Sequence, residues 1–326
     1  MPESPQRPQD HSGSGAREAG NGAAGAGSGA RETGNGAGGA GSGVRDAAVR
    51  DHPGSVVRAA PIGLVCIDVD GTLVGSSGEV HPAVWPAAAH ARERGIRLAL
   101  CTGRPGFGVT RELAARLDPN GWHCFQNGAS VVALGGGRTH SVALARAAVT
   151  ELIERGRAKG RLLELYTDDD YAFEGPPERA RAHAALLGLS FQERPFRRLR
   201  GEIVRGQWLV GHDQTELVLA EPHPGLELSL SASPAMPETR FINITAAGVD
   251  KGRAVRAIAL EYGLPLARVM FVGDSGNDAS ALRIVGWPVA MANAEPGARA
   301  LARITVGDVD AGGVAEALQL AEHAGN

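Results

Sequence analysis

Short apolar runs alternate with predicted helices along most of this chain, and the alternation indicates its architecture. Residues 62–67 (IGLVCI) and 96–101 (IRLALC) are apolar almost throughout, which is typical of strands buried in a parallel sheet. A helix is expected after each run. The first, at 82–94, has a proline near its start and a glycine after its end, and the second spans 105–117. Strands that alternate with helices predict a doubly wound α/β sheet.

The same alternation continues beyond residue 117 and returns near the carboxyl end. A short third strand is expected at 124–125, just before an Asn-Gly pair. The later elements are predicted to be a helix at 252–262, a strand at 269–272, a helix at 278–285, a strand at 289–291 and a helix near 314–321.

The middle of the chain, residues 142–245, has a different pattern. Helices are expected at 147–159, 178–187 and 214–221, and strands at 162–167, 207–210, 226–231 and 241–245. An α/β sheet interrupted by a mixed insert suggests a core domain that carries a cap. We therefore predict a core built from residues 60–141 and 246–326, with an inserted α+β cap at 142–245.

Residues 1–59 differ from the rest in being rich in glycine and alanine, with almost no large apolar side chain. The segment 13–18 recurs at 27–32 and, with two changes, at 41–46, so the repeat has a period of 14 residues. Such a segment buries too little apolar surface to offset the entropy of ordering it, and we predict a flexible tail. Its GxGxxG matches follow no strand and carry no weight as dinucleotide-binding motifs.

Composition narrows the class of protein. The 326 residues carry a net charge of −3, whereas nucleic-acid-binding domains usually show a strong basic excess. No apolar stretch is long enough for a membrane span, and the first residues do not resemble a secretory signal. The three cysteines, Cys66, Cys101 and Cys124, are odd in number and far apart, so neither a disulfide framework nor a CxxC metal site is available. We expect a soluble, cytoplasmic protein that binds neither nucleic acid nor membrane.

Candidate chemistry lies where the predicted core strands end, at the edge of an open α/β sheet that binds ligands. Asp68 and Asp70 follow the first strand, and a glycine comes next. Two neighbouring carboxylates repel one another, so one tends to stay ionised while the other holds a proton, unless a cation neutralises them. This pair suits one nucleophile or metal ligand and one proton donor. The ordinary alternative is a turn aspartate followed by a helix cap.

Three more segments lie at the end of a predicted core strand or at the start of a predicted core helix. Thr102 and Gly103 follow the second strand, where a hydroxyl and an amide can hold an anion; the alternative is a helix N-cap. Lys251 opens the helix after the insert and is one of only two lysines among 33 basic residues, which favours a requirement for a compact positive charge. Asp274 and Asp278 share one loop after a later strand and offer oxygen ligands suited to Mg²⁺.

The order of these segments resembles that of the haloacid dehalogenase superfamily of phosphatases, which share DxDGT, a threonine, a lysine and GDxxND. The resemblance is strongest to the Cof-type branch, which carries a large α+β cap. It covers residues 62–144 and 240–322 and rests on four stretches: DVDGTLVGSSGEVHPAVWPAAAHARERGIRLALCTGR, FQNGASVV, GVDKGRAV and VMFVGDSGNDASALRIVGWPVAMANA.

The resemblance implies a role for each matching residue. Asp68 would attack phosphorus and form an aspartyl-phosphate, and Asp70 would protonate the leaving group and then activate water. Thr102 and the Gly103 amide would hold the phosphoryl oxygens, and Lys251 would neutralise charge between nucleophile and phosphate. Asp274 would bind Mg²⁺ together with Asp68 and the Asp70 carbonyl, and Asp278 would support or join that set.

One further position at a strand end has two interpretations. Asn127 could hydrogen-bond the substrate, or Asn127-Gly128 could be an ordinary hairpin turn. Asp70 favours phosphoryl transfer over dehalogenation, since a dehalogenase has no leaving-group oxygen to protonate. In the insert, the run 168–170 (DDD) is interpreted as a solvated loop and the basic stretch 194–200 as a solvated surface segment.

Taken together, these observations predict a Mg²⁺-dependent phosphomonoester hydrolase that acts on a small phosphorylated metabolite, such as a sugar phosphate. A phosphotransferase or phosphomutase of the same chemistry is the first alternative. A non-catalytic binding protein on this scaffold is the second, and it is disfavoured because every motif residue is retained.

Overall fold

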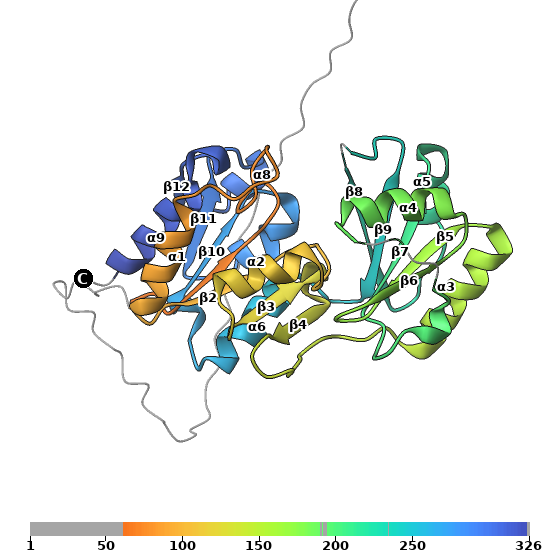
Figure 1. Cartoon of the computed structure of the whole chain (residues 1–326), viewed down its shortest axis with the longest axis horizontal. Helices are drawn as coiled ribbons and strands as arrows, with labels where there is room; N and C mark the ends of the chain where they lie inside the picture. The colour runs from red at the N-terminus through yellow and green to blue at the C-terminus, as the bar shows by residue number, and fades with distance from the viewer. Residues whose placement is uncertain (1–60, 190, 192–193, 234, 325–326) are drawn as a thin grey trace, which may run out of the picture. The chain divides into compact units, whose positions relative to one another are not determined.

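The computed structural model of the chain describes residues 61–189, 191, 194–233 and 235–324. The predicted tail, residues 1–59, lies outside the described residues. Within them, a parallel sheet and an antiparallel sheet lie in separate regions of the structure, as Figure 1 shows. None of the helices in these ranges has both the length and the apolar character needed to cross a membrane.

The core sheet is parallel throughout, in the order β12-β11-β10-β1-β2. Its first strand, β1, lies between β10 and β2 and is fully buried. Because parallel strands need crossover connections, a helix follows most of them. The strands are β1 (Leu64–Ile67), β2 (Arg97–Leu100), β10 (Val269–Gly273), β11 (Trp287–Met291) and β12 (Ile304–Val306).

Helices cover this sheet and confirm the doubly wound architecture (Figure 1). Helix α1 packs against α9, which lies over β1, β10 and β11, and α6 packs against α7. The core helices are α1 (Val84–Glu93), α2 (Val109–Leu117), α6 (Lys251–Glu261), α7 (Ala279–Leu282), α8 (Pro296–Arg299) and α9 (Gly313–His323).

The third predicted strand exists but does not extend the parallel sheet by a regular ladder. Strand β3 (Trp122–Phe125) pairs antiparallel with β4 (Ser130–Ala133), which the sequence did not predict. One isolated bridge, Cys101 to Cys124, links this hairpin to the end of β2. The 3₁₀ turn Gln126–Gly128 joins β3 to β4, so a local hairpin satisfies the strand's backbone groups.

The antiparallel sheet is formed by the predicted insert, with β9 extending one residue beyond it to Ala246, and has the order β6-β5-β7-β9-β8. We refer to this sheet and its helices as the cap. Its strands are β5 (Leu162–Tyr166), β6 (Tyr171–Glu174), β7 (Arg205–Val210), β8 (Leu226–Ala232) and β9 (Arg240–Ala246). Its helices are α3 (Arg146–Lys159), α4 (Pro177–Leu186) and α5 (His212–Leu219).

The two faces of the cap sheet differ in chemistry, because successive strand residues point to opposite faces. One face is apolar: Trp208, Ile242 and their neighbours pack against Leu152 of α3 and Val218 of α5. The other face carries a polar row that crosses four strands in register. This row consists of Glu164 on β5, Gln207 on β7, Asn243 on β9 and Ser229 on β8.

Several element boundaries differ from the prediction. Helix α2 begins at Val109 rather than at 105, because Gly108 adopts a positive φ of 59° and ends the preceding loop. The predicted helix at 278–285 is a single turn, Ala279–Leu282, and the Ile284 amide donates to the Ala281 carbonyl in the tighter 3₁₀ pattern after it. Strands β4, β6 and β12 and the short α8 were not predicted. Further 3₁₀ turns lie at Phe196–Arg198, Leu266–Arg268, Gly276–Asp278 and Val309–Ala311.

A buried histidine in the core gives the first testable prediction, on stability. His123 is fully buried; its Nδ1 accepts from the Leu100 amide at 3.0 Å, and its Nε2 lies 2.9 Å from the Asp118 carbonyl. Burial lowers the pKa of His123 to about 4. The unfolded chain therefore takes up a proton on this histidine below about pH 6.5, while the folded chain does not.

The stabilising contribution of neutral His123 is complete above pH 6.5 and is lost as the pH falls towards 4. We expect this loss to lower the free energy of unfolding by about 2 kcal/mol as the pH falls from 7.5 to 5. Urea unfolding at both pH values measures this, with His123→Asn as the comparison. An equal pH dependence in the two proteins would contradict the prediction.

Candidate active site

The predicted site residues converge at the carboxyl edge of the core sheet. Asp68 follows β1, Asp274 follows β10, and both line a cavity of about 660 Å³ together with Asp70, Gly103 and Asn127. A further group, Thr102, Lys251 and Asp278, is buried at the same edge of the sheet. The structure thus brings together residues from five separate segments.

Lys251 is fully buried at the start of α6 and joins two of the carboxylates. Its Nζ lies 2.6 Å from Asp68 Oδ1 and 2.6 Å from Asp278 Oδ1. Burial alone would lower the pKa of Lys251, but the two carboxylates and their hydrogen bonds raise it above its ordinary value. The lysine therefore carries its charge at neutral pH and fixes one oxygen of Asp68.

Both carboxylate oxygens of Asp278 accept hydrogen bonds from other groups of the site. Its Oδ1 accepts from Lys251, and its Oδ2 accepts from the amides of Asp274 and Ser275 at 2.9 and 3.0 Å. A side chain at Gly273 would place its Cβ 2.5 Å from Asp278 Oδ2, so only glycine leaves room for this arrangement. Both oxygens of Asp278 are thus already engaged, which suits a supporting role.

The acidic cluster has the chemistry of a divalent cation site. Carboxylate oxygens of Asp68, Asp274 and Asp278 all lie within 4.8 Å of one another. Burial, with a smaller contribution from neighbouring Asp278, raises the pKa of Asp274 to about 6. Burial also raises the pKa of Asp68, against the effect of Lys251. A hard cation would offset this crowding of negative charge, and oxygen ligands are what Mg²⁺ prefers.

A glycine makes the close approach of Asp274 possible. Gly71 has a φ of 78°, and a Cβ there would lie 2.4 Å from Asp274 Oδ2. The Thr72 hydroxyl donates to Asp274 Oδ1 at 3.1 Å. The DxDGT segment therefore supplies the aspartates and also the space and the hydrogen bond that place Asp274.

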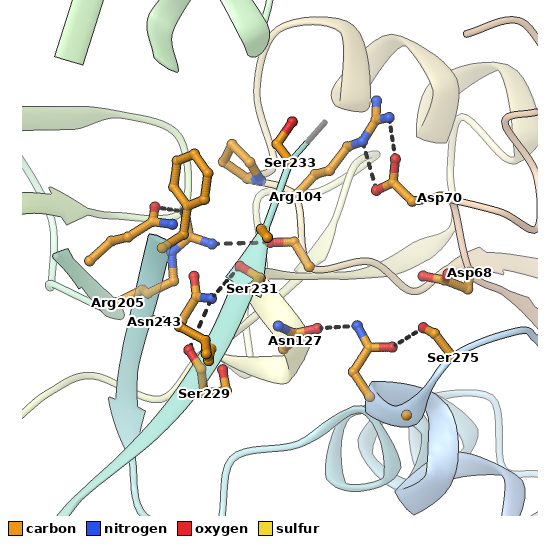
Figure 2. Close-up of a pocket in the computed structure, with 18 of the residues that line it drawn as sticks. Asp68, Asp70, Arg104, Asn127, Arg205, Ser229, Ser231, Ser233, Asn243 and Ser275 are labelled. Atoms are coloured by element: carbon orange, nitrogen blue, oxygen red, sulfur yellow. Dashed lines mark hydrogen bonds and ion pairs between the residues drawn. The ribbon is translucent and has the colours of Figure 1, made fainter. Parts of the chain in front are cut away.

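Asp70 points away from the acidic cluster. Its carboxylate forms a two-bond ion pair with Arg104, with Nε 3.0 Å from Oδ2 and Nη2 2.5 Å from Oδ1 (Figure 2). The Asp70 side chain is 65% exposed, which leaves it accessible at the cavity. Any contact of Asp70 with a cation would thus involve its backbone carbonyl. Arg104 lies within the DxDGT–CTGR stretch, but its pairing with Asp70 leaves no signal in the sequence.

The Thr102–Gly103 loop does not cap a helix, since α2 begins at Val109. The alternative interpretation of Thr102 as an N-cap is therefore wrong. The Thr102 hydroxyl instead accepts from the Arg104 amide at 3.1 Å. Gly103 lies against Asn127, whose amide atoms would be 3.1 and 3.2 Å from an added Cβ.

Both interpretations of Asn127 describe part of the structure. Asn127 lies in the connection of the β3–β4 hairpin with a φ of 55°, and it also lines the cavity. Its Oδ1 accepts from Asn277 Nδ2 at 3.1 Å, and Asn277 Oδ1 accepts from the Ser275 hydroxyl at 2.8 Å (Figure 2).

The cap forms the opposite wall of the cavity with groups that no sequence motif predicts. Ser229, Ser231 and Asn243 lie there, and Figure 2 shows them across from Asp68. Asn243 Nδ2 lies 3.1 Å from the Ser231 hydroxyl. Other cap residues that line the cavity are His183, Leu186, Leu187, Arg205, Gln207, Leu230, Ala232, Ser233 and Phe241. Hydroxyl and amide groups dominate the polar part of this wall.

Of the two predicted surface features, the structure corrects the first and confirms most of the second. The run 168–170 is a loop, but it is not simply solvated: Asp168 Oδ1 lies 2.5 Å from the Ser130 hydroxyl and 2.7 Å from the Ser141 hydroxyl. In the basic stretch, Arg197, Arg198 and Arg200 are exposed as predicted, and Arg194 is partly exposed and forms an ion pair with Asp170. Short polar side chains that meet across distant segments explain why these contacts leave no local sequence signal.

This fold and site define a class: a doubly wound core with an inserted α+β cap, and a lysine-linked aspartate cluster at the sheet edge. The family model for haloacid dehalogenase-like hydrolases matches residues 65–199 and 226–318. The chain belongs to this superfamily, in its Cof-type branch, and is a phosphatase by family.

Individual proteins agree with this assignment. The chain is 28% identical over 239 residues to the HMP-PP phosphatase of Escherichia coli, covering 73% of this chain and 86% of that protein. It is 26% identical over 268 residues to the 5-amino-6-(5-phospho-D-ribitylamino)uracil phosphatase YwtE of Bacillus subtilis, covering 71% and 87%. A haloacid dehalogenase-like hydrolase from Bacteroides thetaiotaomicron has a similar fold, with a TM-score of 0.71 at 23% identity over 79% and 99% of the two chains.

Proposed function

We propose that this protein is a Mg²⁺-dependent phosphomonoester hydrolase that works through an aspartyl-phosphate on Asp68. The observation that carries the proposal is the position of Lys251, which is buried and bound to both Asp68 and Asp278. This contact holds one Asp68 oxygen in place and leaves the carboxylate beside the cavity. A fixed, desolvated carboxylate next to a cation site suits attack on phosphorus.

The reaction has two steps, and Asp70 carries out the proton transfer in each of them. Before the first step Asp70 leaves its ion pair with Arg104 and takes up a proton from solvent. Asp68 Oδ then forms a bond to phosphorus as the ester oxygen leaves, and that oxygen takes the proton from the Asp70 carboxyl group. Asp70, now a carboxylate, removes a proton from water, which attacks the phosphorus and releases inorganic phosphate and Asp68. A bound Mg²⁺ would reduce the repulsion between Asp68 and the phosphoryl oxygens. Asp68, Asp274 and the Asp70 carbonyl would hold it.

The proposed substrate class is a small, hydroxylated phosphate ester such as a sugar phosphate. The cap wall offers Ser229, Ser231 and Asn243 to the cavity, and none of the cap residues described along it is acidic. Hydroxyl and amide groups pair well with the hydroxyls of a sugar or polyol. The two bacterial relatives described above are also named for small phosphorylated metabolites, which supports this size class.

Phosphate release from a panel of sugar phosphates, polyol phosphates and p-nitrophenyl phosphate tests the proposal. We expect turnover with Mg²⁺ and a loss of at least about 100-fold after EDTA treatment, restored by added Mg²⁺, because the cation offsets charge at the reacting phosphoryl group. Folded protein that releases no phosphate from any ester with Mg²⁺ present would overturn the proposal.

A further inference from the structure

The Thr102–Arg104 loop, which would hold the phosphoryl group, is fixed by hydrogen bonds that its three backbone carbonyls accept. Thr102 O accepts from the Asn127 amide at 3.0 Å, and Arg104 O accepts from the Gln126 amide at 3.0 Å. Gly103 O accepts from Arg205 Nη1, also at 3.0 Å. Two donors come from the β3–β4 turn and the third comes from the cap.

The β3–β4 turn is itself in contact with the cap. Gln126 is fully buried, and its Nε2 donates to the Thr167 carbonyl, which follows β5, at 2.9 Å. Gln126 and Asn127 both have a positive φ, of 53° and 55°. Consecutive non-glycine residues in this conformation store strain, which persists only where the surroundings hold it and is frequent at functional sites. The contact with Thr167 is one of the restraints that hold this turn.

Arg205 is built into the cap and reaches the core. It is 4% exposed, its guanidinium carbon lies 4.0 Å from the centroid of the Tyr166 ring, and its Nη2 lies 3.4 Å from Gln207 Oε1. On the core side, Phe107 stacks on Tyr166 and Tyr171 at centroid distances of 6.4 and 5.8 Å. A buried arginine held by an aromatic ring and an amide has few other conformations available, so the cap presents its donor to Gly103 in a defined place.

We propose that Arg205 and Gln126 are positioning residues through which the cap sets the geometry of the Thr102–Arg104 loop. This inference rests on the proposed function of that loop. Each residue joins the cap to a carbonyl of the loop, Arg205 directly and Gln126 through the turn. Neither needs to touch the substrate to act. When these contacts are absent, the Gly103 amide and the Thr102 hydroxyl lose their fixed positions relative to Asp68, and a displacement of about 1 Å can reduce a rate about 100-fold.

Arg205→Met and Gln126→Met test this, since methionine keeps most of the volume and removes the donors. Gln126 Oε1 is buried without a hydrogen-bond partner among the described residues, so the Gln126 substitution removes only the bond to Thr167. Arg161→Met is the matched control: Arg161 is a cap arginine whose side chain is 9% exposed and paired with Glu221. Arg205→Lys keeps one donor and tests for rescue.

The measurements are kcat and KM for several esters, the inhibition constant of inorganic phosphate, and thermal unfolding. We expect both methionine variants to lower kcat by about 10-fold to 100-fold by the same factor for every ester, and to weaken phosphate inhibition. Arg205→Lys should recover part of the loss, and Arg161→Met should match the wild type in kcat. A role confined to stability would lower the melting temperature and leave kcat unchanged.

The outcomes separate this inference from the proposed function. Wild-type protein that hydrolyses no ester would overturn the proposed function. Active wild type with unchanged kcat in both variants would overturn the inference alone. A loss restricted to one class of ester would also overturn it, because Arg205 would then contact the substrate's organic part. If Arg205→Met does not fold, Arg205→Lys and Gln126→Met decide by the same criteria.

Discussion

Replacing Asp68 with asparagine is expected to lower kcat for phosphate release by at least about 1,000-fold, because an amide oxygen is a poor nucleophile towards phosphorus. The folded structure should persist. The new asparagine would still offer an oxygen to Lys251 Nζ, which lies 2.6 Å from Asp68 Oδ1, and Lys251 keeps its ion pair with Asp278. The substitution also removes one negative charge from a buried cluster in which burial and the neighbouring aspartates raise the pKa of Asp68.

Two measurements check this prediction. Phosphate release gives the rate, and the intact mass of enzyme quenched in acid shows whether a phosphoryl group has been added. Wild type should carry that mass during turnover, whereas Asp68→Asn should not. Asp70→Asn is the informative comparison. With a good leaving group it should become phosphorylated but turn over slowly, since its water is not activated. An Asp68→Asn protein with more than about a tenth of wild-type kcat would exclude Asp68 as the nucleophile.

The core could be predicted from the sequence because its signals are local. Strands β1 and β10 are continuous apolar runs, and their burial on both faces requires this composition. Each run ends in the residues of the site, so the motif and the strand that places it are read together. Lys251 could be found through composition, since a chain that uses arginine at almost every basic position retained a lysine there.

The cap wall could not be predicted in the same way. Glu164, Gln207, Asn243 and Ser229 form one row only because four antiparallel strands are in a particular register. The residues of this row are spread widely along the chain, and each alone resembles an ordinary strand residue. Alternation predicts that each of these residues shares a face with the residues two positions before and after it on its own strand. It does not predict which face meets the active site.

Arg104 and Gln126 were missed for a related reason. Both lie inside the quoted motifs, but their partners are distant: Arg104 pairs with Asp70, and Gln126 donates to Thr167. The backbone conformation of Gln126 could not be predicted either, because nothing in the sequence QNG requires a positive φ at glutamine. Long-range contacts of single polar side chains are thus the part of this site that needs coordinates.

Replacing Lys251 with methionine is expected to abolish activity and to destabilise the fold. The lysine is fully buried between Asp68 and Asp278, so its removal leaves two buried carboxylates without the ammonium group that pairs with them. Breaking a buried ion pair in this way costs about 3–5 kcal/mol. Urea unfolding measures the loss, and phosphate release should fall by at least about 1,000-fold because Asp68 is no longer held in place.

The other lysine of the chain, Lys159, is a natural control. Its side chain is 46% exposed and lies 2.5 Å from Glu221, which also pairs with Arg161. Lys159→Met should therefore change the free energy of unfolding by less than about 1 kcal/mol and leave kcat unchanged. Equal stability of the two variants would contradict a charged Lys251 at the centre of the site.

Added Mg²⁺ separates the role of Lys251 in the carboxylate cluster from a simple packing role. In the wild type, carboxylate oxygens of Asp68, Asp274 and Asp278 lie within 4.8 Å of one another, and replacing Lys251 removes a positive charge that compensates them. A divalent cation then neutralises more uncompensated charge than in the wild type, so Mg²⁺ should raise the melting temperature of Lys251→Met by more than that of wild type or Lys159→Met. If Mg²⁺ shifts all three proteins equally, the loss in Lys251→Met comes from packing rather than from charge.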